Sequence, residues 1–141
     1  KARPVSRVIG WRAALAAEIE RHRRLAFAWG DNDCVLFAAD CVQVVTGEDP
    51  AGEIRGRYYT AIGAARILSK LEGGLAAAVT TRFEPIRPGK ARIGDLALLP
   101  SADASFPDGA LGIVTGAVVT VLAPTGLGAV PLSSARAAWR V

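Results

Sequence analysis

The chain has 141 residues, of which 51% are hydrophobic and 21% charged, so its composition excludes a disordered segment and indicates one compact domain over residues 1–141. Two cysteines and one histidine are too few for a four-ligand Cys/His zinc site, and we expect neither a metal nor a cofactor. The formal charge is +4, and the excess positive charge lies in the first 30 residues, which begin with a basic arm over residues 1–10. This charge suits an anionic polymer or an acidic protein, although a solvated helix face explains it more simply.

The first half of the chain predicts helices. Apolar residues and His22 recur every three or four positions over residues 11–28, which predicts an amphipathic helix. Residues 34–46 (CVLFAADCVQVVT) are apolar nearly all round, so we expect them to form a helix in the centre of the domain, between an Asp-Asn-Asp cap and Gly47. A third helix is predicted over residues 57–71, followed by one short helical turn over residues 75–80.

The second half predicts strands. Short apolar or β-branched runs are separated there by Gly, Pro and Asp: residues 82–86, 93–99, 111–115, 118–122 and 129–132. Helices followed by the strands of a small antiparallel sheet indicate an α+β fold. Residues 109–135 carry no charge, but Gly and Pro interrupt them too often for a membrane-spanning helix, and no secretion signal precedes residue 12.

Cys34 is the strongest candidate for chemistry. It opens the central helix directly after Asp33, where unpaired N–H groups and the helix dipole lower the pKa of a thiol, while neighbouring carboxylates raise it. A small buried hydrophobe explains a cysteine at this place equally well. Cys41 lies about 10 Å farther along the same helix, which is too far for a disulfide, so we expect two free thiols and a core role for Cys41.

Several polar residues have simpler structural interpretations. Asp33 is expected to cap the central helix, and Asp40, the one carboxylate inside that helix, needs a hydrogen-bond donor or an exposed edge. Asp95 follows a glycine at the start of a strand and is expected to be structural. Tyr58 and Tyr59 could form a ledge for a sugar or a partner, but at least one of the rings is expected to pack in the core. Glycine-rich stretches lack the nucleotide-binding patterns, and we expect no specific nucleic-acid partner.

Four short motifs resemble, in order, those of NlpC-type bacterial cell-wall peptidases, which are papain-like cysteine enzymes. Residues 29–37 (WGDNDCVLF) resemble the segment that carries the nucleophile in that family. Residues 94–98 (GDLAL) and 111–114 (LGIV) are similar to its Gly-Asp-Leu and His-Val-Gly-Ile strands, and residues 126–139 resemble its closing segment. The resemblance implies a papain-like α+β fold, in which N-terminal helices, including a central buried helix starting at Cys34, pack on a small C-terminal antiparallel sheet. It also implies Cys34 as the candidate nucleophile.

The positions that would assist Cys34 depart from the family pattern. The catalytic His of the family precedes the Val-Gly-Ile core, where this chain has Ala110, and the residue that orients that His would lie near Leu122. General acid–base assistance contributes a factor of roughly 10² to 10⁴ to such a reaction. His22 is the remaining candidate for a base, although packing in the core explains it more simply.

The resemblance leads to functions of different classes. The favoured one is a structural or assembly protein with an incomplete catalytic site, because small NlpC-type relatives occur in tail tips of long-tailed phages and gene transfer agents, beside hub and baseplate proteins. Such a protein would lie in the virion tail, after assembly in the host cytoplasm. The alternative is an active cysteine peptidase or amidase that cleaves peptidoglycan stem peptides with Cys34. A third possibility is a module that binds a small molecule or peptide in the remnant cleft.

Overall fold

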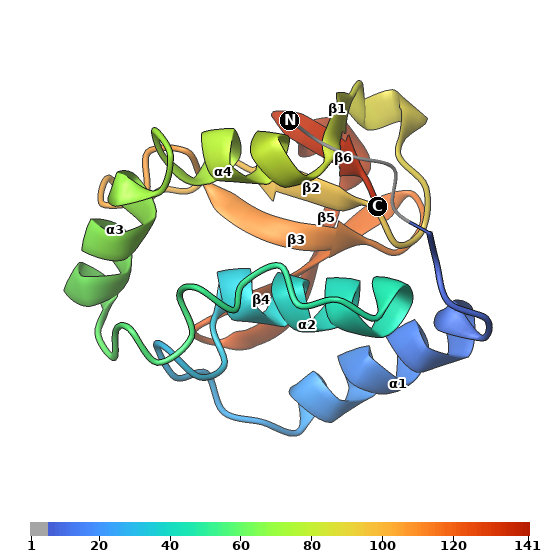
Figure 1. The fold of residues 1–141 in the computed structure, drawn as a ribbon, viewed down its shortest axis with the longest axis horizontal. Coiled ribbons are helices and arrows are strands. Elements are labelled where there is room, and N and C mark those ends of the chain that lie inside the picture. The colour runs from blue at the N-terminus through green and yellow to red at the C-terminus, as the bar shows by residue number, and fades with distance from the viewer. Residues whose placement is uncertain (1–5) are drawn as a thin grey trace.

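The computed structural model describes residues 6–141, so residues 1–5 of the predicted basic arm lie outside the described part of the chain. Within that part the fold is α+β, as predicted, with helices first and a single antiparallel sheet after them (Figure 1). The helices are α1 (Trp11–Arg23), α2 (Cys34–Thr46), α3 (Ala61–Lys70) and α4 (Leu75–Arg82). The strands and 3-10 turns are β1 (Glu84–Ile86), η1 (Pro88–Lys90), β2 (Leu96–Leu99), β3 (Ala110–Val114), β4 (Val118–Ala123), β5 (Gly126–Pro131), η2 (Leu132–Ser134) and β6 (Ala137–Arg140). None of the helices in residues 6–141 has both the length and the apolar character to cross a bilayer.

Helix α2 is the centre of the fold. It packs against α1 on one side and against β3 and β4 on the other, as Figure 1 shows. Nine of its 13 residues are buried, which confirms that an almost wholly apolar helix lies inside the domain. Asp33 caps its first turn by accepting a hydrogen bond from the Leu36 N–H at 3.0 Å. Gly47 ends it with φ at 84°, a value that glycine adopts without strain, so both predicted ends of this helix are confirmed.

The sheet has the strand order β1-β6-β2-β3-β4-β5, and every neighbouring pair is antiparallel. Leucines at alternate positions of β2, together with Leu111 and Ile113 of β3, join the apolar core around α2. A second, smaller cluster on the opposite face consists of Ala97 and Leu99 of β2, Val114 of β3 and Val119 of β4. Strands β2 and β3 are therefore buried on both faces, which explains their unbroken apolar sequences.

Helix α1 is shorter than predicted. The pattern predicts a helix over residues 11–28, but α1 ends at Arg23, so the prediction is wrong for the last turn. A tight turn is the reason: the backbone N–H of Asn32 donates to Ala28 O at 2.8 Å, and the Asn32 side chain donates to Ala26 O at 3.1 Å. The chain therefore leaves the helix early and folds back on itself before α2 begins.

A local cap and strand pairing shift other predicted ends. Helix α3 begins at Ala61, four residues later than predicted, because Thr60 Oγ1 accepts a hydrogen bond from the Gly63 N–H and caps the helix there. Strands β1 and β2 begin later than predicted, whereas β5 begins earlier, with Gly126 opposite Ala123. The sequence did not predict β6, which becomes a strand by pairing with both β1 and β2.

The segment before α1 is fixed to the end of the sheet. The Arg7 guanidinium donates to Ile93 O at 2.8 Å and to Val141 O at 2.9 Å. It also forms an ion pair with Asp95 at 3.0 Å. The described part of the predicted basic arm therefore packs against the domain through Arg7.

Candidate functional site

Cys34 is the first residue of α2, and Asp33 shapes the loop before it. Asp33 Oδ2 accepts hydrogen bonds from the Gly30 N–H at 2.9 Å and from the Tyr58 hydroxyl at 2.7 Å. Gly30 has φ at 83°, and a Cβ at this position would collide with the Tyr58 carbonyl oxygen, so only glycine fits. Asp33 is thus a structural residue, as predicted, and it holds Cys34 in place.

The Cys34 side chain is a protonated thiol at neutral pH. Burial, followed by the charge of Asp33, raises the pKa of Cys34 to about 12. The backbone N–H groups of Leu111, Val35 and Cys34 itself favour the thiolate, but they do not offset the burial. The two opposing influences expected from the sequence therefore leave the thiol protonated rather than activated. Both cysteines are free, and Cys41 is a fully buried core residue.

Cys34 lines an open hollow of about 530 Å³ that lies between the start of α2 and strands β2 to β5; we call it the Cys34 hollow. Ala110, at the start of β3, and Leu122, near the end of β4, line the same hollow. The structure therefore brings together the three positions at which the sequence resemblance expects a nucleophile, a base and an orienting residue. The second and third of these positions are apolar.

Aromatic rings form another part of the wall of the Cys34 hollow. Trp29 stacks on Phe106 with the ring centroids 5.4 Å apart and the planes 8° apart, and Phe27 meets Trp29 edge to face at 4.8 Å. Five exposed residues surround the mouth: Pro100, Ser101, Asp103, Pro124 and Ser134. The lining is thus mostly apolar, and its polar members Ser101, Asp103 and Ser134 are exposed. The sequence offered no signal for this ring stack, because its members lie far apart in the chain.

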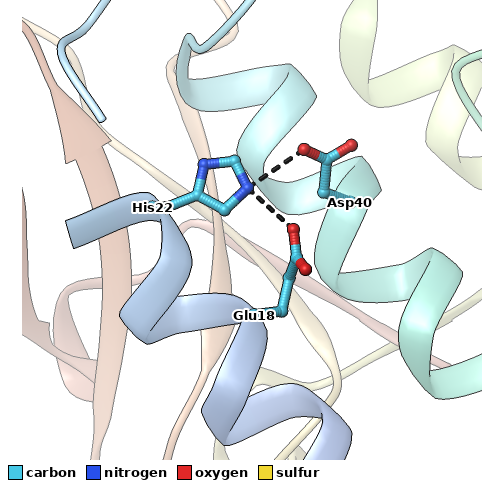
Figure 2. A group of neighbouring side chains, drawn as sticks. All are labelled: Glu18, His22 and Asp40. Carbon is cyan, nitrogen blue, oxygen red and sulfur yellow. Dashed lines mark hydrogen bonds and ion pairs between the residues drawn. The ribbon is translucent and has the colours of Figure 1, made fainter. Parts of the chain in front are cut away.

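His22 has both ring nitrogens occupied by other partners. Its Nδ1 bonds Asn32 Oδ1, and its Nε2 lies 3.0 Å from both Glu18 Oε2 and Asp40 Oδ2 (Figure 2). The Asn32 amide nitrogen donates to a backbone carbonyl, so its oxygen is the acceptor and His22 Nδ1 carries a proton. Nε2 faces two carboxylate oxygens and is a donor as well. Neither nitrogen is therefore available to take a proton from Cys34.

The surroundings of His22 favour its charged form. Burial of the ring opposes protonation, but hydrogen bonds to Asp40 and Asn32 and the charge of Asp40 outweigh it and raise the pKa of His22. Burial also disfavours ionised Asp40, yet hydrogen bonds from His22 and Arg55 hold the pKa of Asp40 below its usual value. The Arg55 guanidinium donates to Asp40 Oδ1 at 2.6 Å. The lone carboxylate of the apolar helix thus finds the donors that its burial requires.

Glu18, His22 and Asp40 belong to residue types that bind divalent metals, and one ligand atom of each lies within 4.8 Å of the others. However, a cation of the chain already contacts all three residues from the solvent side. Arg21 Nη2 lies 2.6 Å from Glu18 Oε2 and 3.2 Å from His22 Nε2. It also lies 3.3 Å from Asp40 Oδ2. A metal ion would have to displace this guanidinium and deprotonate His22, so we describe these four residues as an ion-pair cluster that joins α1 to α2.

The remaining candidates are structural. Asp95 is 0% exposed, and its carboxylate accepts hydrogen bonds from the side chains of Arg7 and Arg140 and from two backbone N–H groups. This role agrees with the sequence expectation. Tyr58 is buried, as expected for one ring of the pair, whereas Tyr59 is 75% exposed. The two rings therefore do not form a common ledge.

Comparison with known proteins identifies a family. The sequence profile of DUF6950, a domain of unknown function, matches residues 6–141. The chain belongs to the DUF6950 family. No curated protein and no solved structure matches it.

Proposed function

We propose that this DUF6950 domain is a non-catalytic relative of the NlpC-type cysteine peptidases and serves as a structural component of a phage or phage-like tail tip. One observation carries the non-catalytic assignment: Cys34, Ala110 and Leu122 line a single hollow. The hollow therefore has apolar side chains at the two positions where a cysteine peptidase needs an imidazole and a polar group that orients it. The position of Cys34 at the start of a central helix, packed on an antiparallel sheet, supports the proposed papain-like relationship.

Two steps of peptide hydrolysis lack the groups that they need. Attack requires a thiolate, but burial and the charge of Asp33 keep Cys34 protonated at neutral pH. Expulsion of the amine requires a proton donor near the sulfur, and the single histidine of the chain is held by Glu18, Asp40 and Asn32. The domain therefore keeps a nucleophilic residue type without the means to use it.

The placement in a tail tip rests on the resemblance to small NlpC-type proteins found there. In this role the domain would contact hub and baseplate proteins within the virion tail. The exposed arginines of α1 and the residue after it, Arg12, Arg23 and Arg24, suit a further contact with peptidoglycan or another anionic polymer. Neither contact needs a peptidase reaction.

The reactivity of Cys34 tests the non-catalytic assignment. Alkylation of Cys34 by iodoacetamide, followed by mass spectrometry from about pH 6 to about pH 11, is expected to rise throughout without a plateau. The reason is the raised pKa of about 12. Hydrolysis of purified peptidoglycan that Cys34→Ala abolishes would contradict the proposal, as would an alkylation midpoint below about pH 8.

Ala110→His tests whether position 110 lies where a base would act. The N–H of an imidazole beside the sulfur stabilises the thiolate by donating a hydrogen bond, so the alkylation midpoint of this variant is expected to fall by about one pH unit. Ser101→His places the same ring at the exposed mouth of the hollow and is expected to leave the midpoint unchanged. Equal alkylation midpoints in the two variants would show that a side chain at position 110 does not influence the pKa of Cys34.

The assembly role is tested in the particle that carries the domain. Cys34→Ala is expected to leave the number and the infectivity of particles unchanged, because the thiol has no chemical task. Deletion of the whole domain is expected to stop tail completion. Normal tails without the domain would contradict a structural role. Defective tails with a folded Cys34→Ala domain would contradict the claim that the Cys34 thiol has no chemical task.

A further inference from the structure

We infer that Glu18, His22 and Asp40 form a binding site for a divalent transition-metal ion such as Zn²⁺, which joins α1 to α2 by taking the place of the Arg21 side chain. None of these residues lines the Cys34 hollow, and the inference does not depend on the proposed function. Two of the ligands lie on α1 and the third comes from α2, so spacing along the chain alone could not predict the site.

The ligand atoms of the three residues lie close together. Glu18 and His22 are four residues apart on α1, a spacing that places two side chains on the same face of a helix. His22 Nε2 lies 3.0 Å from Glu18 Oε2 and 3.0 Å from Asp40 Oδ2, and Figure 2 shows this nitrogen directed toward both carboxylate groups. Ligand atoms that bind zinc tetrahedrally at about 2.0–2.1 Å lie about 3.3 Å from one another. Both distances are therefore about 0.3 Å shorter than those of a zinc site.

Side chains outside this group of three hold two of the ligands in the orientation that a metal needs. Asn32 Oδ1 accepts the Nδ1 proton of His22, so Nε2 is the ring nitrogen that faces the carboxylates. Asn32 is itself fixed, because its amide nitrogen donates to a backbone carbonyl at 3.1 Å. Arg55 donates to Asp40 Oδ1 at 2.6 Å, and the other oxygen, Oδ2, faces His22. Partners of this kind on the outer atoms are typical of metal-binding histidines and carboxylates.

A cation of the chain already contacts the three ligand atoms. Arg21 Nη2 lies between 2.6 and 3.3 Å from all of them, so these atoms present a surface to which a positive group binds. The Arg21 side chain is 53% exposed, and exposed ion pairs contribute little to stability, so it can turn into solvent at a small cost. The guanidinium therefore marks the position of a cation without closing the site to a metal ion.

The exchange preserves the charge of the cluster. Two positive groups, the protonated His22 ring and the Arg21 guanidinium, balance two carboxylates in the metal-free state. When a divalent ion binds, the His22 Nε2 proton passes to solvent, the freed lone pair binds the metal, and Arg21 leaves. The ion thus supplies the two positive charges that were lost. It also removes the close approach of two donors, since Arg21 Nη2 lies 3.2 Å from His22 Nε2.

The donor atoms determine the class of metal. One imidazole nitrogen and two carboxylate oxygens suit Zn²⁺ and other divalent first-row transition metals, whereas Mg²⁺ and Ca²⁺ prefer oxygen ligands alone. The side chains of Glu18 and Asp40 are 12% and 16% exposed, so water can reach the position that Arg21 leaves. This water would be the fourth ligand of a tetrahedral ion.

Titration of the full chain, stripped of metal with a chelator, tests the site. Isothermal titration calorimetry is expected to show one Zn²⁺ bound per chain with a Kd in the micromolar range, and no binding of Mg²⁺. His22 is the single histidine of the chain, so its imidazole nitrogen signals in NMR are expected to move with one equivalent of Zn²⁺. Cys34→Ala is expected to keep the affinity. Absence of saturable binding, unmoved His22 signals, or loss of binding in Cys34→Ala would overturn the inference.

Glu18→Gln removes one ligand charge with little change in shape and is expected to weaken Zn²⁺ binding by about a hundredfold or more. Glu20→Gln is the matched control, because Glu20 lies exposed on the same helix and pairs only with Arg23 among the ion pairs of residues 6–141. It is expected to keep the affinity of the wild type. Circular dichroism establishes that both variants are folded. Equal Kd values for the two folded variants would overturn the assignment of the ligands.

Arg21→Gln removes the competing guanidinium and is expected to tighten Zn²⁺ binding by about threefold or more. Arg23→Gln removes an exposed arginine of the same helix that lies outside the cluster, and it is expected to leave the Kd unchanged. Misfolding would weaken binding, so it cannot produce the expected gain in affinity. An unchanged or weaker affinity in Arg21→Gln would overturn the exchange between the guanidinium and the metal.

Discussion

Helix α2 takes part in two sites of opposite character. Asp40 belongs to an ion-pair cluster in which charged partners surround each group, whereas Cys34 opens onto a mostly apolar hollow whose lining, among residues 6–141, includes no histidine. The single histidine of the chain lies in the cluster, and Ala110 lies in the hollow. Helix α2 carries Cys34 and also binds His22 of α1 through Asp40, yet the two residues do not form a catalytic pair, because the partners that surround each residue decide its chemistry.

Phe37→Asp would destroy both sites and is expected to have the largest effect. Phe37 is 0% exposed, and its ring meets the edge of His22 at 4.9 Å, so it packs between the core and the ion-pair cluster. A charge there has no partner, and we expect a loss of more than about 4 kcal/mol, which unfolds the domain. Circular dichroism during thermal melting measures this. Tyr59→Asp, at a 75% exposed position, is the control and is expected to melt like the wild type. A folded Phe37→Asp protein that melts cooperatively would contradict the burial of α2 in the centre of the domain.

His22→Ala breaks the cluster and leaves the hollow intact. It leaves a cavity in place of a fully buried ring and leaves the Asn32 side-chain oxygen without its donor, so we expect a loss of about 3 kcal/mol in the free energy of unfolding. Glu18 and Asp40 keep their ion pairs with Arg21 and Arg55. Urea titration measures the loss. Arg23→Ala removes only an exposed ion pair with Glu20 and is expected to cost less than about 1 kcal/mol. Equal losses in the two variants would show that the cluster does not stabilise the fold.

The pH dependence of the free energy of unfolding tests whether His22 is protonated and Asp40 is ionised in the ion-pair cluster. The pKa of His22 is raised in the folded state, so its contribution is complete below about pH 6.5 and is lost as the pH rises through the folded value. The pKa of Asp40 is lowered, so its contribution is present above about pH 4 and is lost as the pH falls. The stability difference between wild type and His22→Ala is expected to be largest between these limits. A difference that grows from about pH 6 to about pH 9 would contradict a charged His22.

Cys34→Ala is expected to have the smallest effect. The side chain lines an open hollow and shares no ion pair, so its removal should change the free energy of unfolding by less than about 1 kcal/mol. Cys41→Ala removes a fully buried side chain from the core and is expected to cost more, about 1 to 2 kcal/mol. Chemical denaturation of the two variants measures both values, and the reverse order would mean that Cys34 has a structural role.

The sequence predicted best where the signals are local. The cap at Asp33, the apolar run that follows it and Gly47 act within a few residues of one another, and both ends of α2 are confirmed. The end of α1 and the whole of β6 were not predicted, because they depend on the folded-back Asn32 turn and on pairing with strands that lie far away in the chain. For the same reason Arg21 and Arg55 did not stand out as partners of Asp40.

By itself, the sequence determined that helices precede the sheet, that the most apolar helix is central and that Cys34 and Cys41 cannot form a bridge, since these follow from hydropathy and spacing along the chain. Only the tertiary structure decided that Ala110 and Leu122 share a hollow with Cys34 and that His22 is enclosed by acidic groups. The physical reason is that the pKa of a thiol or an imidazole depends on burial and on charges within a few ångströms, and folding brings those charges together from distant positions in the chain.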